Sequence, residues 1–118
     1  MKEIIIYIRP NMYFQTKEAL YEKGFTSMNS QLVYGHGKKT TDYTLNADAD
    51  GSHEIAEYPF VAKKQINITV RDEDAQTVID TVIAVNQTHT AGDGKIFVIP
   101  VEKAVRIRTK ETNEDALM

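Results

Sequence analysis

A glycine-rich segment in the last third of the chain could hold an anion. It runs from Thr88 to Lys95 and reads Thr-His-Thr-Ala-Gly-Asp-Gly-Lys. Gly92 and Gly94 flank Asp93 and allow close backbone approach, so successive amides can converge on an anion, and Lys95 adds positive charge. The segment therefore predicts a phosphate site; the alternative is a tight turn between a helix and a strand.

A pair of arginines follows this segment. Arg106 and Arg108 stand two residues apart and alternate with Val105 and Ile107. On a strand, both guanidinium groups would lie on one face, where paired guanidinium forks suit a polyphosphate. The alternative is an ordinary surface arginine pair.

These cations belong to an acidic chain. Its 118 residues contain 14 Lys plus Arg and 17 Asp plus Glu, a net charge of −3, which offers no general attraction to nucleic acid or acidic lipid. Any anion site must therefore be local, and five cations attached to glycine-rich turns favour a nucleotide-phosphate site: Lys38, Lys39, Lys95, Arg106 and Arg108.

Length and composition indicate one globular domain, residues 1–118. The 42% of hydrophobic residues suffices for a core, and the absence of cysteine excludes disulfides and thiolate metal sites and is compatible with a reducing compartment. The apolar run at 4–8 is too short for a signal core or a membrane span. We therefore expect a cytoplasmic protein without membrane insertion.

Hydrophobic periodicity places the elements that must position these residues. Strands are expected at 3–9, 27–34, 64–70 and 96–99, and helices at 16–23 and 72–86, the second with Asp72 or Asp74 as N-cap. This order predicts an α+β, ferredoxin-like doubled βαβ unit with helices on one face of an antiparallel sheet. Strands this apolar on both sides predict that other subunits cover the second face. The polar tail from Lys110 is expected to fray unless a partner or a neighbouring subunit holds it.

Several motifs together resemble the PII nitrogen-regulatory signal-transduction proteins. The similarity covers nearly the whole chain apart from the long loop, and its most specific part is the pair of segments 88–98 and 105–109. The beginning of the chain, Arg9-Pro10, Glu18-Ala19-Leu20 and the glycines of 35–37 also fall where that family has them.

The resemblance implies a trimer that binds ATP or ADP in clefts between subunits and senses 2-oxoglutarate together with Mg-ATP. Phosphates would be held by Gly37, Lys38 and the segment 92–95, with Arg106 and Arg108 arriving from the neighbouring subunit. Asn29 and Thr69 would surround the base. The implied nucleotide-binding set is Asn29, Gly37, Lys38, Thr69, Thr88, Gly92, Asp93, Gly94, Lys95, Arg106 and Arg108.

The resemblance also implies a protruding T-loop at about 38–62 that binds a protein partner, with a polar tail at 109–118. The contact positions expected in the loop are Thr40, Tyr43, Asp48, Asp50 and Tyr58. Lys63 matches the lysine that pairs with the carboxylate of 2-oxoglutarate. The partner is expected to be nitrogenase, or alternatively an ammonium transporter or another metabolic enzyme, and the assembly a homotrimer or a hetero-oligomer with a paralogue.

Two departures from the family pattern concern Lys39 and the loop. Lys39 stands where the family usually has a glutamine whose carbonyl oxygen ligates Mg²⁺, and an ammonium group cannot accept that role, which weighs against 2-oxoglutarate sensing. The loop is about five residues longer than in typical members. Within the family, the chain is most similar to the nif-cluster branch, whose members control nitrogenase by binding its dinitrogenase component. This similarity rests on Lys39, on the loop length and on the sequences of segments 85–88 and 99–102.

Competing functions are weaker. A phosphotransferase or ATPase needs a base near the γ-phosphate, and no convincing one stands in the sequence, so a sensor rather than an enzyme is expected. An RNA-binding module of this fold needs exposed aromatics on a basic sheet, whereas the chain is acidic. The calcium-loop spacing from Asn46 to Glu57 lacks flanking helices and is interpreted as a solvated acidic loop, so no metal site is expected from protein side chains.

Overall fold

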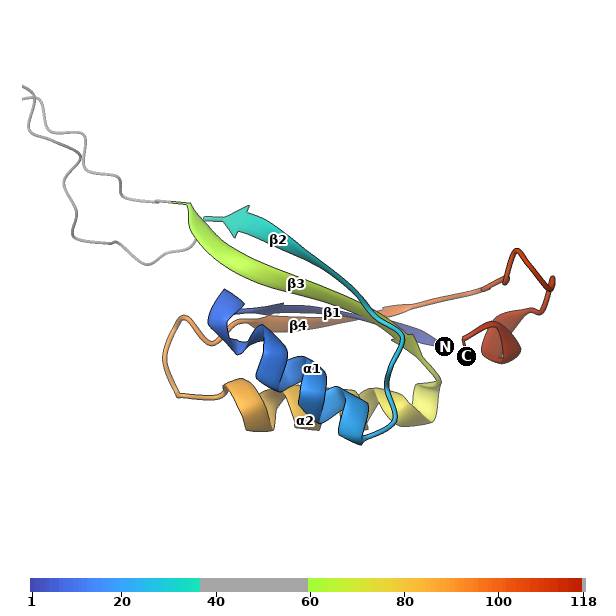
Figure 1. The fold of residues 1–118 in the computed structure, drawn as a ribbon, viewed down its shortest axis with the longest axis horizontal. Helices are drawn as coiled ribbons and strands as arrows, with labels where there is room; N and C mark the ends of the chain where they lie inside the picture. The colour runs from blue at the N-terminus through green and yellow to red at the C-terminus, as the bar shows by residue number, and fades with distance from the viewer. Residues whose placement is uncertain (37–59, 118) are drawn as a thin grey trace, which may run out of the picture.

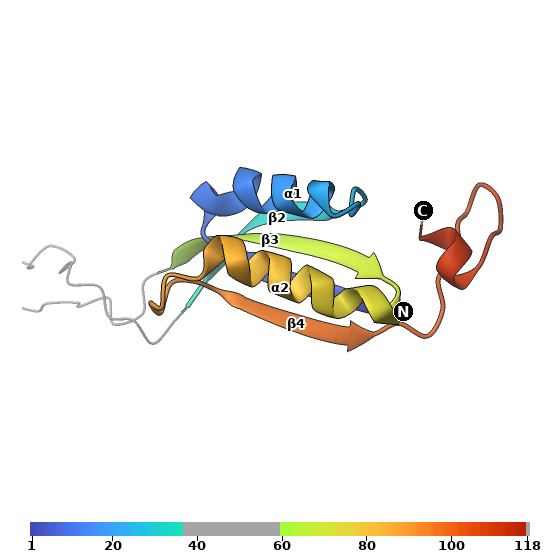
Figure 2. The same cartoon turned by 90° about the horizontal axis from the view of Figure 1, so that it is seen from below.

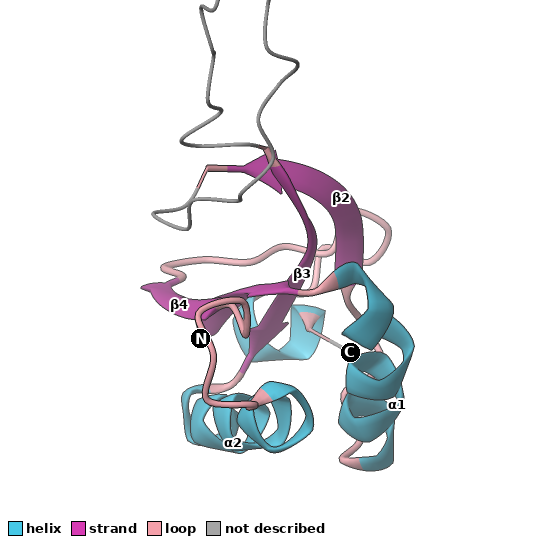
Figure 3. Ribbon diagram, turned by 90° about the vertical axis from the view of Figure 1, so that its left-hand side faces the viewer, coloured by secondary structure: helices cyan, strands magenta, loops and turns pink. Residues whose placement is uncertain are grey.

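Two helices cover one face of a four-stranded antiparallel sheet (Figure 1). A computed structural model describes residues 1–36 and 60–117. The main elements in chain order are β1 Lys2–Ile8, α1 Tyr13–Glu22, β2 Asn29–Gly35, β3 Val61–Val70, α2 Ala75–Asn86 and β4 Lys95–Pro100. Figure 2 and Figure 3 show both helices lying along the same side of the sheet. The predicted ferredoxin-like arrangement is confirmed.

The strands are ordered β2-β3-β1-β4, and every neighbouring pair is antiparallel. The register places Ile6 of β1 between Ile66 of β3 and Ile96 of β4. Because side chains alternate along a strand, this row faces the helices. The core between sheet and helices consists of Ile4, Ile6, Ile8, Leu20, Ile66, Ile68, Val70, Val78 and Val82.

The opposite face of the sheet is also partly apolar. Ile5 and Tyr7 of β1 lie there beside Phe97 of β4, and the rings of Tyr7 and Phe97 meet edge to face with centroids 6.1 Å apart. Phe97 is 49% exposed and Ile99 on the same face 44% exposed. We call this surface, defined by Ile5, Tyr7, Phe97 and Ile99, the open face; none of the other described elements covers it.

Helix α1 begins earlier than predicted. A 3-10 turn, η1 Pro10–Met12, leads into it at Tyr13, because proline is well placed in a first helical turn and the Thr16 hydroxyl donates 2.7 Å to the Met12 carbonyl. The expected stop is confirmed: Gly24 has φ of +93° and donates to the carbonyl of Tyr21.

The predicted side-chain cap of α2 is wrong. A 3-10 turn, η2 Asp72–Asp74, precedes this helix, and neither η2 nor α2 has a capping bond from the side chain that precedes it. Asp72 instead binds the N-terminal ammonium group of Met1 at 2.8 Å, and this bond holds the pKa of the Asp72 carboxyl below its ordinary value. The chain start lies beside η2 because β1 pairs with the end of β3, Lys2 opposite Val70.

Strand β3 begins at Val61, three residues before its predicted start and inside the expected loop of 38–62. Its pairing with β2 extends to Gly35 opposite Val61, so the hairpin arms are longer than the apolar alternation indicated. No helix among residues 1–36 and 60–117 is long and apolar enough to cross a membrane.

The segment after β4 differs most from prediction. Arg106 and Arg108 were expected on one strand face, but only Val105 makes a bridge, to Thr112, and 107–109 form a turn that leaves Ile107 94% exposed. The turn forms because Arg106 exchanges backbone bonds with Glu111 and Lys110, both 2.8 Å. The tail is not frayed either: it folds into a 3-10 turn, η3 Asn113–Ala116.

Candidate functional site

The structure divides the predicted nucleotide-binding residues into two groups. Thr88 and the segment 92–95 lie where β4 begins, and Lys63 reaches them from β3 with its ammonium group 2.7 Å from the Gly92 carbonyl oxygen. Asn29 and Thr69 lie at the other end of the sheet. Six residues along β3 separate Lys63 from Thr69, about 20 Å.

Arg106 belongs to the second group, and Arg108 lies in the turn that follows it. Val101, the residue after β4, donates to the carbonyl of Met1, at the end of β1 opposite to Tyr7, which pairs with Lys95. Arg106 follows from there. We call the two groups the phosphate end (Lys63, Thr88 and 92–95) and the base end (Asn29, Thr69 and Arg106). One chain brings each group together but does not join the two.

The Asp93 carboxylate organises the phosphate end. Its Oδ2 accepts the Thr88 amide at 2.7 Å, and its Oδ1 accepts the Thr88 hydroxyl in a very short bond. The Thr90 hydroxyl adds a further bond of 3.2 Å. The bonds from Thr88 above all, with those from the Arg9 guanidinium and the Thr90 amide, hold the pKa of Asp93 well below its ordinary value, so the carboxylate is ionised at neutral pH.

Part of the predicted amide cradle is used within the loop itself. The amides of Thr88 and Thr90 donate to Asp93, and the amide of Asp93 donates to the Thr90 carbonyl at 3.2 Å. The side of the turn that can receive an anion is therefore the one with Gly92, Gly94, Lys63 and Lys95. These bonds make Asp93 the residue that orients the loop.

Arg9 braces the same loop and was missed as a site residue. Its guanidinium donates 2.9 Å to Asp93 Oδ1 and 2.8 Å to the Thr90 hydroxyl. The side chain lies so close over Gly92 that a Cβ there would overlap Nη2. The pair joins residues 84 positions apart, so no local spacing reveals it. The sequence offered one weak signal, an arginine directly after a strongly apolar strand. That its partner is Asp93 follows only from the fold.

A cavity of about 490 Å³ opens on the open-face side of the phosphate end. Lys63 and Lys95 bring two positive charges to it, Gly92 and Gly94 bring backbone, and Tyr7 with Val33 forms an apolar wall. Cations beside exposed backbone and an apolar wall suit an anion that carries an organic part.

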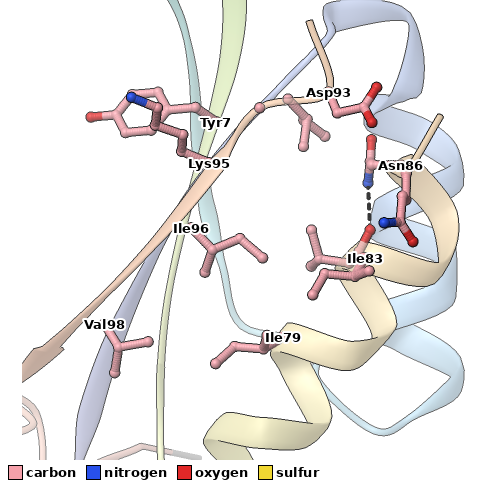
Figure 4. A pocket seen from close by; sticks show the side chains of 12 residues that line it. Tyr7, Ile79, Ile83, Asn86, Asp93, Lys95, Ile96 and Val98 are labelled. Atoms are coloured by element: carbon pink, nitrogen blue, oxygen red, sulfur yellow. Dashed lines mark hydrogen bonds between the residues drawn. The ribbon is translucent and has the colours of Figure 1, made fainter. Parts of the chain in front are cut away.

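A second cavity, of about 450 Å³, lies between β4 and α2. Figure 4 shows Ile96 and Val98 facing Ile79 and Ile83 across it, with Lys95 on the far side of the strand. Most of its lining is apolar, its buried Asn86 donates to the Thr16 hydroxyl and the Val82 carbonyl, and Asp93 and Lys95 contribute opposite charges. It is therefore less suited to an anion than the first cavity, which has Lys63 and Lys95 and, among the described residues that line it, no carboxylate.

The base end has its own smaller cavity, of about 240 Å³. Asn29, Asn67 and Thr69 supply amide and hydroxyl groups, and Met28 supplies an apolar wall. Arg106 lies in the adjoining hairpin, where its guanidinium pairs with Glu111 at 3.3 Å. The cavity offers both donors and acceptors, as the edge of a nucleobase requires.

Some of the predicted residues lie outside the described part of the chain: Gly37, Lys38, Lys39, Thr40, Tyr43, Asp48, Asp50 and Tyr58. The calcium-loop spacing at 46–57 lies there too. Within residues 1–36 and 60–117, no cluster of histidine and carboxylate side chains could hold a metal ion.

Comparison with known proteins agrees with the resemblance seen in the motifs. The family model described as nitrogen regulatory protein P-II matches residues 1–111. The chain is 43% identical to "nitrogen fixation nifHD region GlnB-like protein 2" of Methanobacterium ivanovii, and both chains are covered completely. It is 40% identical to the protein of that name from Methanothermobacter marburgensis, over 99% of this chain and all of the relative. It is 33% identical to nitrogen regulatory protein P-II of Cereibacter sphaeroides, again over 99% of this chain and all of that relative.

Proposed function

Since the chain belongs to the P-II family of nitrogen regulatory proteins, we propose that it is a non-catalytic sensor of ATP and ADP that regulates a protein partner. The observation that carries this proposal is the separation of the two ends. A phosphate end and a base end, each with fitting chemistry, lie about 20 Å apart on one sheet. A complete site then needs the phosphate end of one copy beside the base end of another.

A homotrimer supplies that arrangement three times. Its packing would also cover the open face, where Phe97 and Ile99 are half exposed. In each cleft, the phosphates would be held by Lys63, Lys95 and the turn 92–94 of one copy. The neighbouring copy would hold the base with Asn29 and Thr69 and reach the phosphates with Arg106. Arg108 and Thr88 complete the proposed set.

The partner would be recognised through the segment 38–62. The names of the relatives from nifHD regions favour nitrogenase over an ammonium transporter. Changes at the phosphate end have a direct route to that segment, because β2 and β3 carry it and Lys63 binds the Gly92 carbonyl. The ammonium group of Lys63, beside Gly92, could also pair with a carboxylate such as that of 2-oxoglutarate. Because Lys39 has no acceptor atom, Mg²⁺ would then need other ligands.

The first test is calorimetric titration of the purified oligomer with ATP, ADP and AMP, with and without Mg²⁺ and 2-oxoglutarate. We expect micromolar binding of ATP and ADP and its loss in Arg106→Ala. An assembled oligomer that binds no adenine nucleotide would overturn the proposal. An effect of 2-oxoglutarate on ATP affinity would establish sensing despite Lys39.

The sharper test mixes two defective variants. Arg106→Ala removes the base end and Lys95→Ala the phosphate end, so a homotrimer of either has no intact cleft. A trimer assembled from both has a cleft with Lys95 of one copy and Arg106 of the other. We expect ATP binding to return only after unfolding and joint refolding of the two variants, whereas a site within one chain would stay defective in every mixture.

Partner choice is tested by binding of immobilised protein to purified dinitrogenase component and, in parallel, to a detergent-solubilised ammonium transporter. We expect retention of dinitrogenase that changes when ADP is replaced by ATP. Retention of the transporter alone would assign the chain to the alternative partner.

A further inference from the structure

The residues after β4 form a small folded unit rather than a loose tail. The amide of Asn113 donates 2.7 Å to the carbonyl of Ala104, and Val105 bridges to Thr112, which closes a hairpin. The turn η3 follows, and the amide of Leu117 donates 3.2 Å to the carbonyl of Glu114. Figure 2 shows this unit beside the N-terminal end of the chain, away from the phosphate end.

The last residues of the unit lie against the base end. Ala116 and Leu117 line the cavity of about 240 Å³ together with Asn29, Asn67 and Thr69. Leu117 also lines a neighbouring cavity of about 230 Å³, which Thr69 shares. Leu117 is partly buried, although it stands next to the chain end in a polar segment.

The chemistry of the 240 Å³ cavity is divided between its walls. Strands β1, β2 and β3 provide carboxylate, amide and hydroxyl groups from Glu3, Asn29, Asn67 and Thr69, whereas Met28, Ala116 and Leu117 provide the apolar part of the lining. A planar base with a hydrogen-bonding edge and apolar faces fits such a space, since an asparagine can pair with both a donor and an acceptor on the edge of adenine.

Arg106, which is proposed to bind phosphate, also makes hydrogen bonds next to this wall. Its Nη1 donates 3.3 Å to Glu111 Oε1, and its Nη2 donates 3.5 Å to the carbonyl of Ala116. The arginine proposed to reach the phosphates therefore also holds the residue beside Leu117 in place.

We infer that Leu117 and the turn η3 form the outer wall of the adenine subsite, and that Arg106 and Glu111 hold this wall in position. The inference rests on the proposed function, because it assigns a ligand class to the base end. It makes Leu117 a residue that discriminates for a base, with no part in binding the phosphates.

The test compares Leu117→Ala with Ile107→Ala. Both variants shorten an aliphatic side chain in the same C-terminal unit, but Ile107 is 94% exposed on the hairpin turn. Calorimetry would measure ATP, adenosine and inorganic tripolyphosphate with each. We expect Leu117→Ala to weaken ATP and adenosine about five- to tenfold through lost apolar contact, with tripolyphosphate unchanged, and Ile107→Ala to stay within about twofold of wild type.

Three outcomes decide the inference. Wild-type affinity for ATP and adenosine in Leu117→Ala would overturn it, and so would tighter binding, which would mean that the turn obstructs the site. Equal weakening of ATP and tripolyphosphate would overturn the assignment to the base. Loss of adenine nucleotide binding in the wild type itself would instead overturn the proposed function.

Glu111→Gln provides a second variant that leaves the wall residues unchanged. It removes the charge that pairs with Arg106, so we expect η3 to loosen and amide hydrogen exchange at 113–117 to accelerate, with weaker adenosine binding. Unchanged exchange would show that the ion pair of Glu111 with Arg106 does not position the wall.

Discussion

At the scale of single residues, the turn into β4 depends on Gly94. Its φ of +114° is in the region that side chains avoid, and a Cβ would overlap the carbonyl oxygen of Tyr7. We expect Gly94→Ala to cost at least about 1–3 kcal/mol of unfolding free energy, since strain and a backbone overlap act together. Urea unfolding followed by circular dichroism measures this change.

Gly35→Ala is the matched control for that substitution. Gly35 lies on β2, and no atom lies within 4 Å of the position that a Cβ would take there, so its stability should change by less than about 0.5 kcal/mol. Equal stabilities of the two variants would show that the turn can move away from Tyr7.

Arg9 acts, on this geometry, through Asp93. We expect Arg9→Met to weaken ATP and ADP about tenfold, because Asp93 loses a neutralising partner and the loop loses the bond to Thr90. In an Asp93→Asn background the same change should have little further effect, as measured by calorimetry on the double-mutant cycle.

Additive losses in that cycle would contradict a positioning role for Arg9 and would indicate a direct contact with phosphate.

The contrast between Arg9 and Asp93 also shows what a sequence can reveal. Asp93 stands between two glycines, a local pattern with a recognisable meaning, whereas the bond between Arg9 and Asp93 exists only because β1 and β4 pair.

At the scale of elements, the start of β1 is attached to the start of the α2 region. Asp72 binds the N-terminal ammonium group at 2.8 Å and lies 3.9 Å from the Lys2 ammonium group. The bond with the N-terminal ammonium group, above all, lowers the pKa of the Asp72 carboxyl below its ordinary value, so ionised Asp72 stabilises the folded state. That contribution is present above the ordinary carboxyl pKa and is lost as the pH falls through the lower, folded-state pKa.

Asp72→Asn should therefore lower the Tm at pH 7, and the difference from wild type should shrink at pH 3. Glu73→Gln, the exposed neighbour in η2, serves as the control and should leave the Tm unchanged at both values. A constant difference between Asp72→Asn and wild type across this range would mean that the charge of Asp72 does not contribute.

Elements with a strong apolar period were predictable, and short turns were not. Alternation of Ile66, Ile68 and Val70 identified β3, and all three are buried as expected. The same alternation around Arg106 was misleading, because a hairpin turn at 107–109 ends the extended backbone after one bridge. The 3-10 turns before both helices arise from tertiary contacts and from Pro10, which periodicity does not record.

At the scale of the whole molecule, two features of the single chain fit the proposed assembly of several copies. The helices cover one face of the sheet (Figure 1). The open face exposes the aromatic side chain of Phe97 and the aliphatic side chain of Ile99. The phosphate end and the base end stand apart along the strands. In a ring of copies, the open faces can be buried against one another. The same ring can bring the phosphate end of one copy to the base end of the next.

Phe97→Glu tests whether assembly buries the open face. Phe97 lies beside Ile5 and against Tyr7, so in an assembled protein a carboxylate there would be buried among apolar side chains without a partner. In a separate copy it would be solvated on a half-exposed strand. We expect light scattering coupled to gel filtration to give the mass of a trimer for the wild type and of a monomer for Phe97→Glu.

Ile107→Glu is the control, because it places the same charge on a side chain that is 94% exposed, and it should keep the trimer mass. ATP titration then links assembly to the site. Each half-site remains folded in a monomer, so if ligand binding needs both ends, Phe97→Glu loses ATP affinity although no nucleotide-binding residue has changed. A monomeric Phe97→Glu that still binds ATP like the wild type would place the complete site within one chain.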